Sequence, residues 1–101
     1  MMKDFGWFKI VPHGDGTEEF EEYKKYHNKI EKEKVARHMR TLRAGVTSVP
    51  SYDVFTGEKL QAGLFEDGEF IFPMEFLHYY ENYDIGIPYD YEDYLVNELK
   101  L

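Results

Sequence analysis

Aromatic and β-branched side chains dominate residues 5–11, where the sequence reads FGWFKIV before Pro12. Such residues favour extended backbone, and a proline removes the backbone donor that a continuing strand would need. The pattern predicts a β-strand over 5–11 and a glycine-containing turn over 13–16.

A helix is predicted from Thr17 to Arg43, with Gly45 as its stop. Acidic residues crowd its first turns and basic residues its later ones, which is the order that the helix dipole favours. Its apolar positions form two sets that lie roughly 120° apart at the helical repeat. These sets are Phe20, Tyr23, His27 and Ile30 on one side, and Val35, Met39 and Leu42 on the other. We therefore expect one long or kinked helix over 17–44, and the alternative is a break near 31–34.

Three short β-runs follow a connecting loop at 46–51, and turn residues separate them. The runs cover 52–56, 59–65 and 69–72. Asp67-Gly68 between the last two is a strong hairpin signal, because both residues tolerate positive φ. Side chains alternate along the second and third runs, so an antiparallel meander is the simplest interpretation.

Two prolines mark the starts of two short C-terminal helices. After Pro73, apolar residues recur at helical spacing as far as Tyr83, and residues 82–87 interrupt them. After Pro88 a second stripe consists of Tyr91, Tyr94, Leu95 and Leu99. The order β-α-β-β-β-α-α predicts one α+β domain over 1–101. Its first strand should join the meander in one small antiparallel sheet, with the helices on one face.

Composition adds an aromatic core to this fold. Phe, Tyr and Trp make up 18% of the 101 residues, and each brings a large buried area. Cysteine is absent, which fits a reducing compartment. No apolar run approaches the roughly 20 residues of a membrane span. We therefore expect a cytoplasmic protein without a membrane partner.

Charge is divided along the chain. The formal net charge is −8, yet residues 1–45 hold ten Lys and Arg against eight Asp and Glu, while residues 46–101 hold two against twelve. The second part repels phosphate backbones and suits a basic partner. The first part contains a basic stretch at 24–43, where Lys25, Lys29, Lys32, Arg40 and Arg43 could line one side of the helix.

Motifs for catalysis, cofactors or metals are absent from the sequence. His13, His27, His38 and His78 form no metal-binding spacing, and we expect His27 at the edge of the core and the others in solvent. The loop at 13–17 lacks the lysine of a phosphate-binding loop and precedes four glutamates. Ser48 and Ser51 are not in a nucleophile motif. We expect no enzyme activity, no cofactor and no metal.

The leading hypothesis rests on the tyrosines and acids of the C-terminal third. Exposed tyrosine among acids is a composition that suits recognition of a basic protein surface. We expect a protein–protein interaction module, of inhibitor or immunity type, whose partner-binding residues are Tyr83, Asp84, Tyr89, Asp90, Glu92 and Asp93. Two alternatives stay open: a nucleic-acid-binding module that uses the helix at 24–43, and a small ligand-binding domain or enzyme. A homo-oligomer is also possible, through Val35, Met39 and Leu42.

Overall fold

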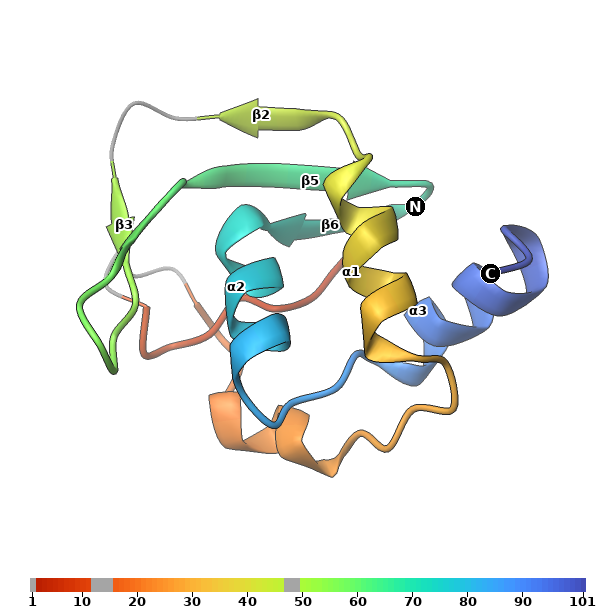
Figure 1. The fold of residues 1–101 in the computed structure, drawn as a ribbon, viewed down its shortest axis with the longest axis horizontal. Coiled ribbons are helices and arrows are strands. Elements are labelled where there is room, and N and C mark those ends of the chain that lie inside the picture. The colour runs from red at the N-terminus through yellow and green to blue at the C-terminus, as the bar shows by residue number, and fades with distance from the viewer. Residues whose placement is uncertain (1, 12–15, 47–49) are drawn as a thin grey trace.

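The protein has a small α+β fold in a computed structural model that describes residues 2–11, 16–46 and 50–101 (Figure 1). The larger of its two sheets has four strands in the order β1-β6-β5-β2. These strands are β1 (Lys3–Asp4), β2 (Ala44–Val46), β5 (Gly63–Asp67) and β6 (Phe70–Pro73). The smaller sheet pairs β3 (Ser51–Tyr52) with β4 (Lys59–Leu60). The helical elements are η1 (Phe20–Lys25), α1 (Lys32–Arg40), α2 (Met74–Asn82), α3 (Tyr89–Asp93) and η2 (Tyr94–Glu98).

The predicted strand over 5–11 is wrong. The first strand of the sheet is Lys3–Asp4, just before that range, and it pairs parallel to β6, so the sheet is mixed and not antiparallel throughout. Gly6 has a φ of +78° and lies so close to Phe76 that a Cβ would be 2.7 Å from its ring. This left-handed residue turns the chain away from the sheet. Phe5 and Phe8 both become buried in the core.

The predicted meander divides between the two sheets. The β5–β6 hairpin forms as expected, with Gly68 in its turn at a φ of +61°. The second run is interrupted at Gly63, whose φ is +154°. Leu60 and Phe65 are buried, while Leu64 is exposed, so the inward-facing set changes at this glycine. The fourth strand of the larger sheet, β2, comes from the end of the predicted helix and the start of the predicted loop.

The long helix over 17–44 is wrong. The break covers residues 26–31, so it begins earlier than the alternative position near 31–34 and meets it at Glu31. A 3-10 helix, η1, ends at Lys25, and α1 begins at Lys32. The chain between them is extended at Tyr26 and at Glu31. Because η1 and α1 are separate helices with different directions, the apolar positions of 17–44 do not lie on one face of a single helix.

The homo-oligomer surface predicted from Val35, Met39 and Leu42 is instead part of the core. Val35 and Met39 are fully buried, and Leu42 packs against the core. The two C-terminal helices are confirmed, and each follows its proline directly.

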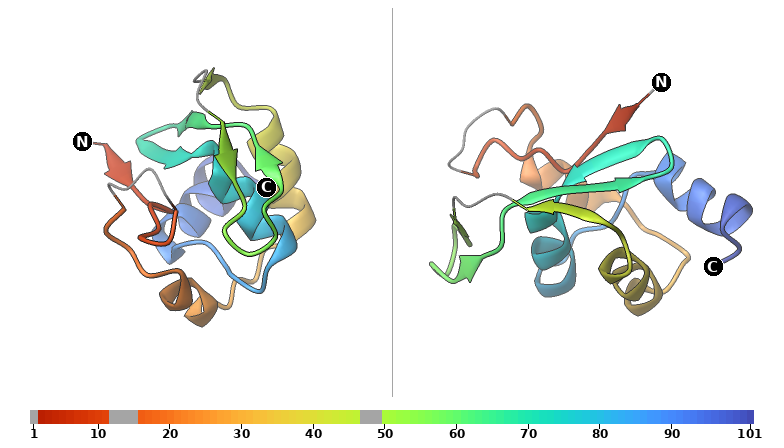
Figure 2. Two further views of the ribbon diagram at one scale, coloured as in Figure 1. Left: turned by 90° about the vertical axis from the view of Figure 1, so that its left-hand side faces the viewer. Right: turned by 90° about the horizontal axis from the view of Figure 1, so that it is seen from above.

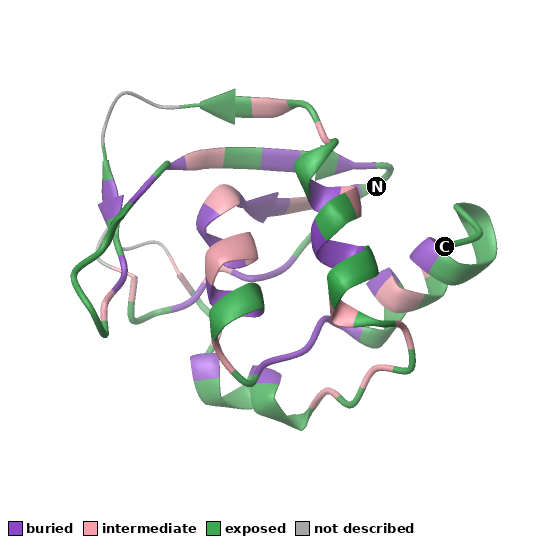
Figure 3. Ribbon diagram, in the orientation of Figure 1, coloured by how far each residue is buried: buried purple, intermediate pink, exposed green. Residues whose placement is uncertain are grey.

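Aromatic side chains fill the space between the sheet and the helices. Phe5 stacks on Phe72 with ring centroids 4.6 Å apart and meets Phe76 edge-on at 5.1 Å. Figure 2 shows the N-terminal segment crossing beside the sheet toward η1. Purple segments in Figure 3 mark the buried positions on α1, α2 and the strands that face one another.

Candidate functional site

The six residues predicted to bind a partner do not form one surface. Asp84, Tyr89, Asp90 and Asp93 are exposed, whereas Tyr83 and Glu92 are partly buried. The polar atoms of Tyr83 and Glu92 form hydrogen bonds within the protein.

Glu92 holds the segment between η1 and α1. One carboxylate oxygen accepts a hydrogen bond of 3.0 Å from the side-chain amide of Asn28, and the other accepts the backbone N–H groups of Lys29 at 2.7 Å and Ile30 at 3.1 Å. Burial alone would raise the pKa of Glu92, but these donors and the charge of Lys29 lower it. Glu92 is therefore a structural anchor and not part of an exposed contact surface.

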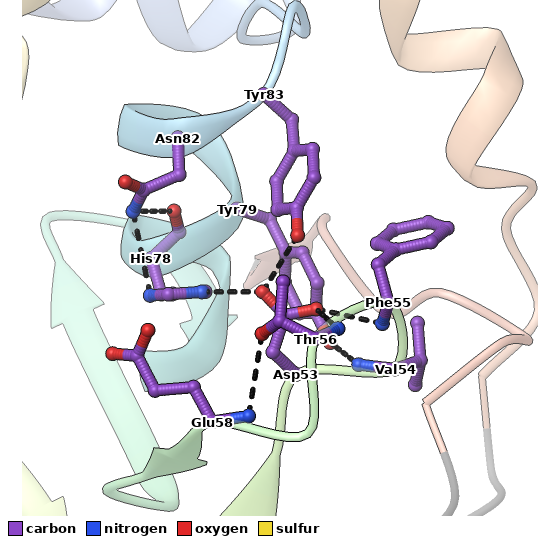
Figure 4. A network of polar contacts seen from close by, with 9 residues as sticks. All are labelled: Asp53, Val54, Phe55, Thr56, Glu58, His78, Tyr79, Asn82 and Tyr83. Carbon is purple, nitrogen blue, oxygen red and sulfur yellow. Dashed lines mark hydrogen bonds and ion pairs between the residues drawn. The ribbon is translucent and has the colours of Figure 1, made fainter.

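Tyr83 belongs to a polar network around Asp53, which Figure 4 shows from close by. Asp53 is 2% exposed. One of its oxygens lies 2.7 Å from Nε2 of His78 and 2.8 Å from the hydroxyl of Tyr83. The other oxygen accepts the backbone N–H groups of Phe55 and Thr56. The carboxylate thereby joins the β3–β4 loop to α2.

The polar groups of the Asp53 network are occupied by contacts with one another. Burial alone would raise the pKa of Asp53, but the hydrogen bonds from His78, Tyr83 and the loop backbone lower it to about 2. Nδ1 of His78 lies 3.4 Å from the amide of Asn82, so both ring nitrogens of His78 face protein groups. A buried carboxylate with this many donors is stable as an anion without any ligand.

A second buried aspartate, Asp67, forms a similar pair with His38. The carboxylate lies 2.8 Å from Nε2 of His38, and it accepts the hydroxyl hydrogen bonds of Tyr91 at 2.7 Å and Tyr94 at 3.2 Å. Burial and the Asp67 charge raise the pKa of Tyr91. His38 and His78 are therefore not solvated, contrary to expectation. Their partners are 29 and 25 residues away, a separation that offers no local signal.

The basic residues of 24–43 do not line one side of a helix. Lys25 pairs with Glu22 on η1, and Arg40 pairs with Glu81 of α2. Lys32 points inward, where its ammonium donates to the backbone oxygens of Tyr80, Tyr83 and Ile85. Lys32 thus compensates carbonyl groups at the end of α2 that lack helical partners. Its charge is therefore not at the surface, where the nucleic-acid hypothesis placed it.

Tyr89 instead meets residues just after the end of η1. The rings of Tyr26 and Tyr89 contact edge to face, with centroids 5.0 Å apart, and the Tyr89 hydroxyl accepts the backbone N–H of His27 at 3.1 Å. Burial raises the pKa of Tyr26, and the charges of Glu18, Asp90 and Glu22 raise it further. Glu18, Glu22 and Asp90 therefore act on Tyr26, while Lys25 pairs with Glu22 and Lys3 lies 3.9 Å from Asp90. We name the group of Glu22, Tyr26, Tyr89 and Asp90 the Tyr26–Tyr89 patch.

The sequence pointed to half of the Tyr26–Tyr89 patch. Tyr89 and Asp90 were among the predicted contact residues, whereas Glu22 and Tyr26 were assigned to an uninterrupted helix. The apolar positions change direction between Ile30 and Val35, so the sequence carried no signal for the extended backbone at Tyr26.

No three His, Asp or Glu side chains come together as a metal-binding group in residues 2–11, 16–46 and 50–101. None of the helices in that part of the chain combines the length and apolar character needed to cross a membrane. Most of the predicted 13–16 turn lies outside the described residues.

Comparisons with known proteins identify no relative: no protein-family model, curated protein or solved structure matches the chain. The chain's own geometry is therefore the only basis for a functional proposal.

Proposed function

We propose that this domain is a non-catalytic protein-binding module, of inhibitor or immunity type, that recognises a basic surface on another protein through the Tyr26–Tyr89 patch. The observation that carries the proposal is the contact between two tyrosines from separate elements with Glu22 and Asp90 beside them. Tyr89 is 49% exposed, which leaves ring area for a partner.

The chemistry of the patch suits a lysine or arginine side chain. Tyrosine rings attract a cation through their electron-rich faces, and the neighbouring carboxylates add a direct charge interaction. Tyrosine also contributes a large contact area at low entropic cost, because only two side-chain torsions have to be fixed. The net charge of −8 favours approach of a basic partner from a distance.

Rigid support makes the patch a better binding surface than isolated side chains would be. Tyr89 is fixed by a hydrogen bond from the backbone of His27. Glu92, two residues further along α3, anchors the chain that follows Tyr26. A preorganised surface loses less entropy on binding.

Capture from a native lysate tests the proposal when wild type and two variants are compared. The double variant Tyr89→Ala with Asp90→Asn should lose a partner that wild type retains at low salt, and added salt should weaken the wild-type capture. Asp84→Asn is the matched control, because Asp84 is exposed and lies outside the patch. Equal capture by both variants, or binding of labelled DNA or RNA by the wild type, would contradict the proposal.

A further inference from the structure

A groove of about 430 Å³ lies between α1 and the C-terminal end of the chain. It is distinct from the Tyr26–Tyr89 patch, with which it shares no residue. Its walls are formed by Lys34, Arg37, His38, Thr41, Lys100 and Leu101. Among the described residues, the lining contains no acidic side chain, although the whole protein has 20 Asp and Glu against 12 Lys and Arg.

Two of the groove's cations have no counter-ion. Lys34 and Lys100 are exposed and make no ion pair within the described part of the chain. Arg37 pairs only with Glu33, and both side chains are largely exposed, so that pair is weak and readily exchanged. The groove is therefore lined by two unpaired cations and one weakly paired cation, which favour an anionic ligand.

His38 supplies an oriented nitrogen in the same groove. Its Nε2 is fixed on the buried carboxylate of Asp67, which is itself held by Tyr91 and Tyr94. Nδ1 makes no hydrogen bond to any residue that the structure describes. When His38 is protonated, Nε2–H donates to Asp67 and Nδ1–H becomes free to donate to an anion.

Lys100 is held in an unusual backbone conformation at the groove. Its φ is +59°, the only positive value for a non-glycine residue in the described chain. A lysine in this region costs energy that a glycine would not. The turn persists because Leu99 N–H bonds to the Tyr94 oxygen and Leu101 N–H to the Leu95 oxygen. The end of η2 thus places Lys100 opposite α1.

From these observations we propose that the groove binds a small phosphorylated anion. Its volume lies in the range of small-molecule sites, and Arg37 offers the planar fork that matches phosphate oxygens. Lys34 and Lys100 supply point charges, and the His38 ring, fixed by Asp67, lines the same groove.

Titration of the full chain with pyrophosphate, followed by amide and histidine-ring NMR signals, tests the site. Saturable shifts are expected at Lys34, His38 and Lys100. Lys34→Gln and Lys100→Gln should each weaken binding about fivefold, as expected for a partly exposed charge pair. Lys59→Gln makes the same charge change on β4, away from the groove, and should leave the affinity unchanged. Retained amide spectra show that the variants fold.

The outcomes that overturn the proposal are specific. Absence of saturable shifts removes the site, and an equal loss in Lys59→Gln shows that only general charge attraction is present. If citrate competes as well as pyrophosphate, the groove selects charge and the phosphoryl assignment is wrong.

Discussion

Asp53 lies at the start of the loop that joins β3 to β4, and its carboxylate collects hydrogen bonds from two directions. The backbone of Phe55 and Thr56 approaches from the loop, while His78 and Tyr83 approach from α2 and the residue after it. Hydrogen bonds to a buried ionised group are among the stronger ones in proteins. A single side chain therefore fixes the smaller sheet to the main core.

Asp53→Asn should lower the free energy of unfolding by about 2–4 kcal/mol, because an amide cannot accept all these donors and leaves buried groups without partners. Urea unfolding measures the change. Asp93→Asn removes an equal charge from an exposed position on α3 and should shift the free energy by less than about 0.5 kcal/mol. Similar effects of the two substitutions would show that the network contributes little.

The pKa of Asp53 also predicts a response to acid. Because its folded-state pKa falls from 3.8 to about 2, its stabilisation is complete above about pH 4 and disappears as the pH falls toward 2. The difference corresponds to roughly 2 kcal/mol. Stability measured across this window should fall more steeply with decreasing pH in wild type than in Asp53→Asn.

At the scale of secondary structure, the break between η1 and α1 decides which surfaces exist. The run of Glu and Lys at 31–34 leads into α1, while the preceding segment is extended at Tyr26 and Glu31 and is not helical. The backbone N–H groups of Lys29 and Ile30 donate to Glu92. The side-chain amide of Asn28 donates to the carbonyl oxygen of Ile87 and accepts the backbone N–H of Ile87. Contacts with a segment about 60 residues away thus replace the hydrogen bonds of a local helix.

Glu92→Ala should release this segment, so the amides of Lys29 and Ile30 should exchange with solvent faster while those of α1 stay protected. The expected loss of stability is about 1–2 kcal/mol, since the released donors are close to water. Hydrogen exchange by NMR measures both. Asp93→Ala, at the adjacent exposed position, should leave these amides unchanged. Equal exchange in the two variants would contradict the anchoring role of Glu92.

For the whole molecule, burial of the Val35 and Met39 face of α1 argues against the predicted dimer surface. Met39→Ala should cost about 2–5 kcal/mol by leaving a cavity, with the sedimentation coefficient of the folded protein unchanged. Val96→Ala, at an exposed apolar position of η2, should affect neither quantity. A change of oligomeric state in Met39→Ala with little loss of stability would restore the dimer hypothesis.

Charge behaves differently in the folded protein from its division along the chain. Lys3 lies near Glu69 and Asp90, and Arg40 contacts Glu81, so these two cations pair with acids of the second half. Lys9, Lys24, Lys25 and Arg37 instead pair with acids of the first half. What remains distinct is local: the acidic Tyr26–Tyr89 patch and the basic groove at His38.

The sequence by itself determined the features that depend on near neighbours. Pro73 and Pro88 open helices because proline suits a helix start, and Gly68 turns a hairpin because it accepts positive φ. The alternation of Phe70 and Phe72 with their neighbours predicted a buried face, and both are buried. The α+β class followed from these elements, since each is stabilised largely within a few residues of chain.

Only the tertiary structure decided the features that depend on distant partners. The helix break needs Glu92, the inward Lys32 needs the end of α2, and each buried aspartate needs a histidine more than 20 residues away. A single chain's periodicity carries no information on such pairs. The set of proposed partner-binding residues changed for this reason. Tyr83 and Glu92 form hydrogen bonds inside the protein and leave the set. Tyr26 and Glu22 enter it with Tyr89 and Asp90, because folding brought η1 beside α3.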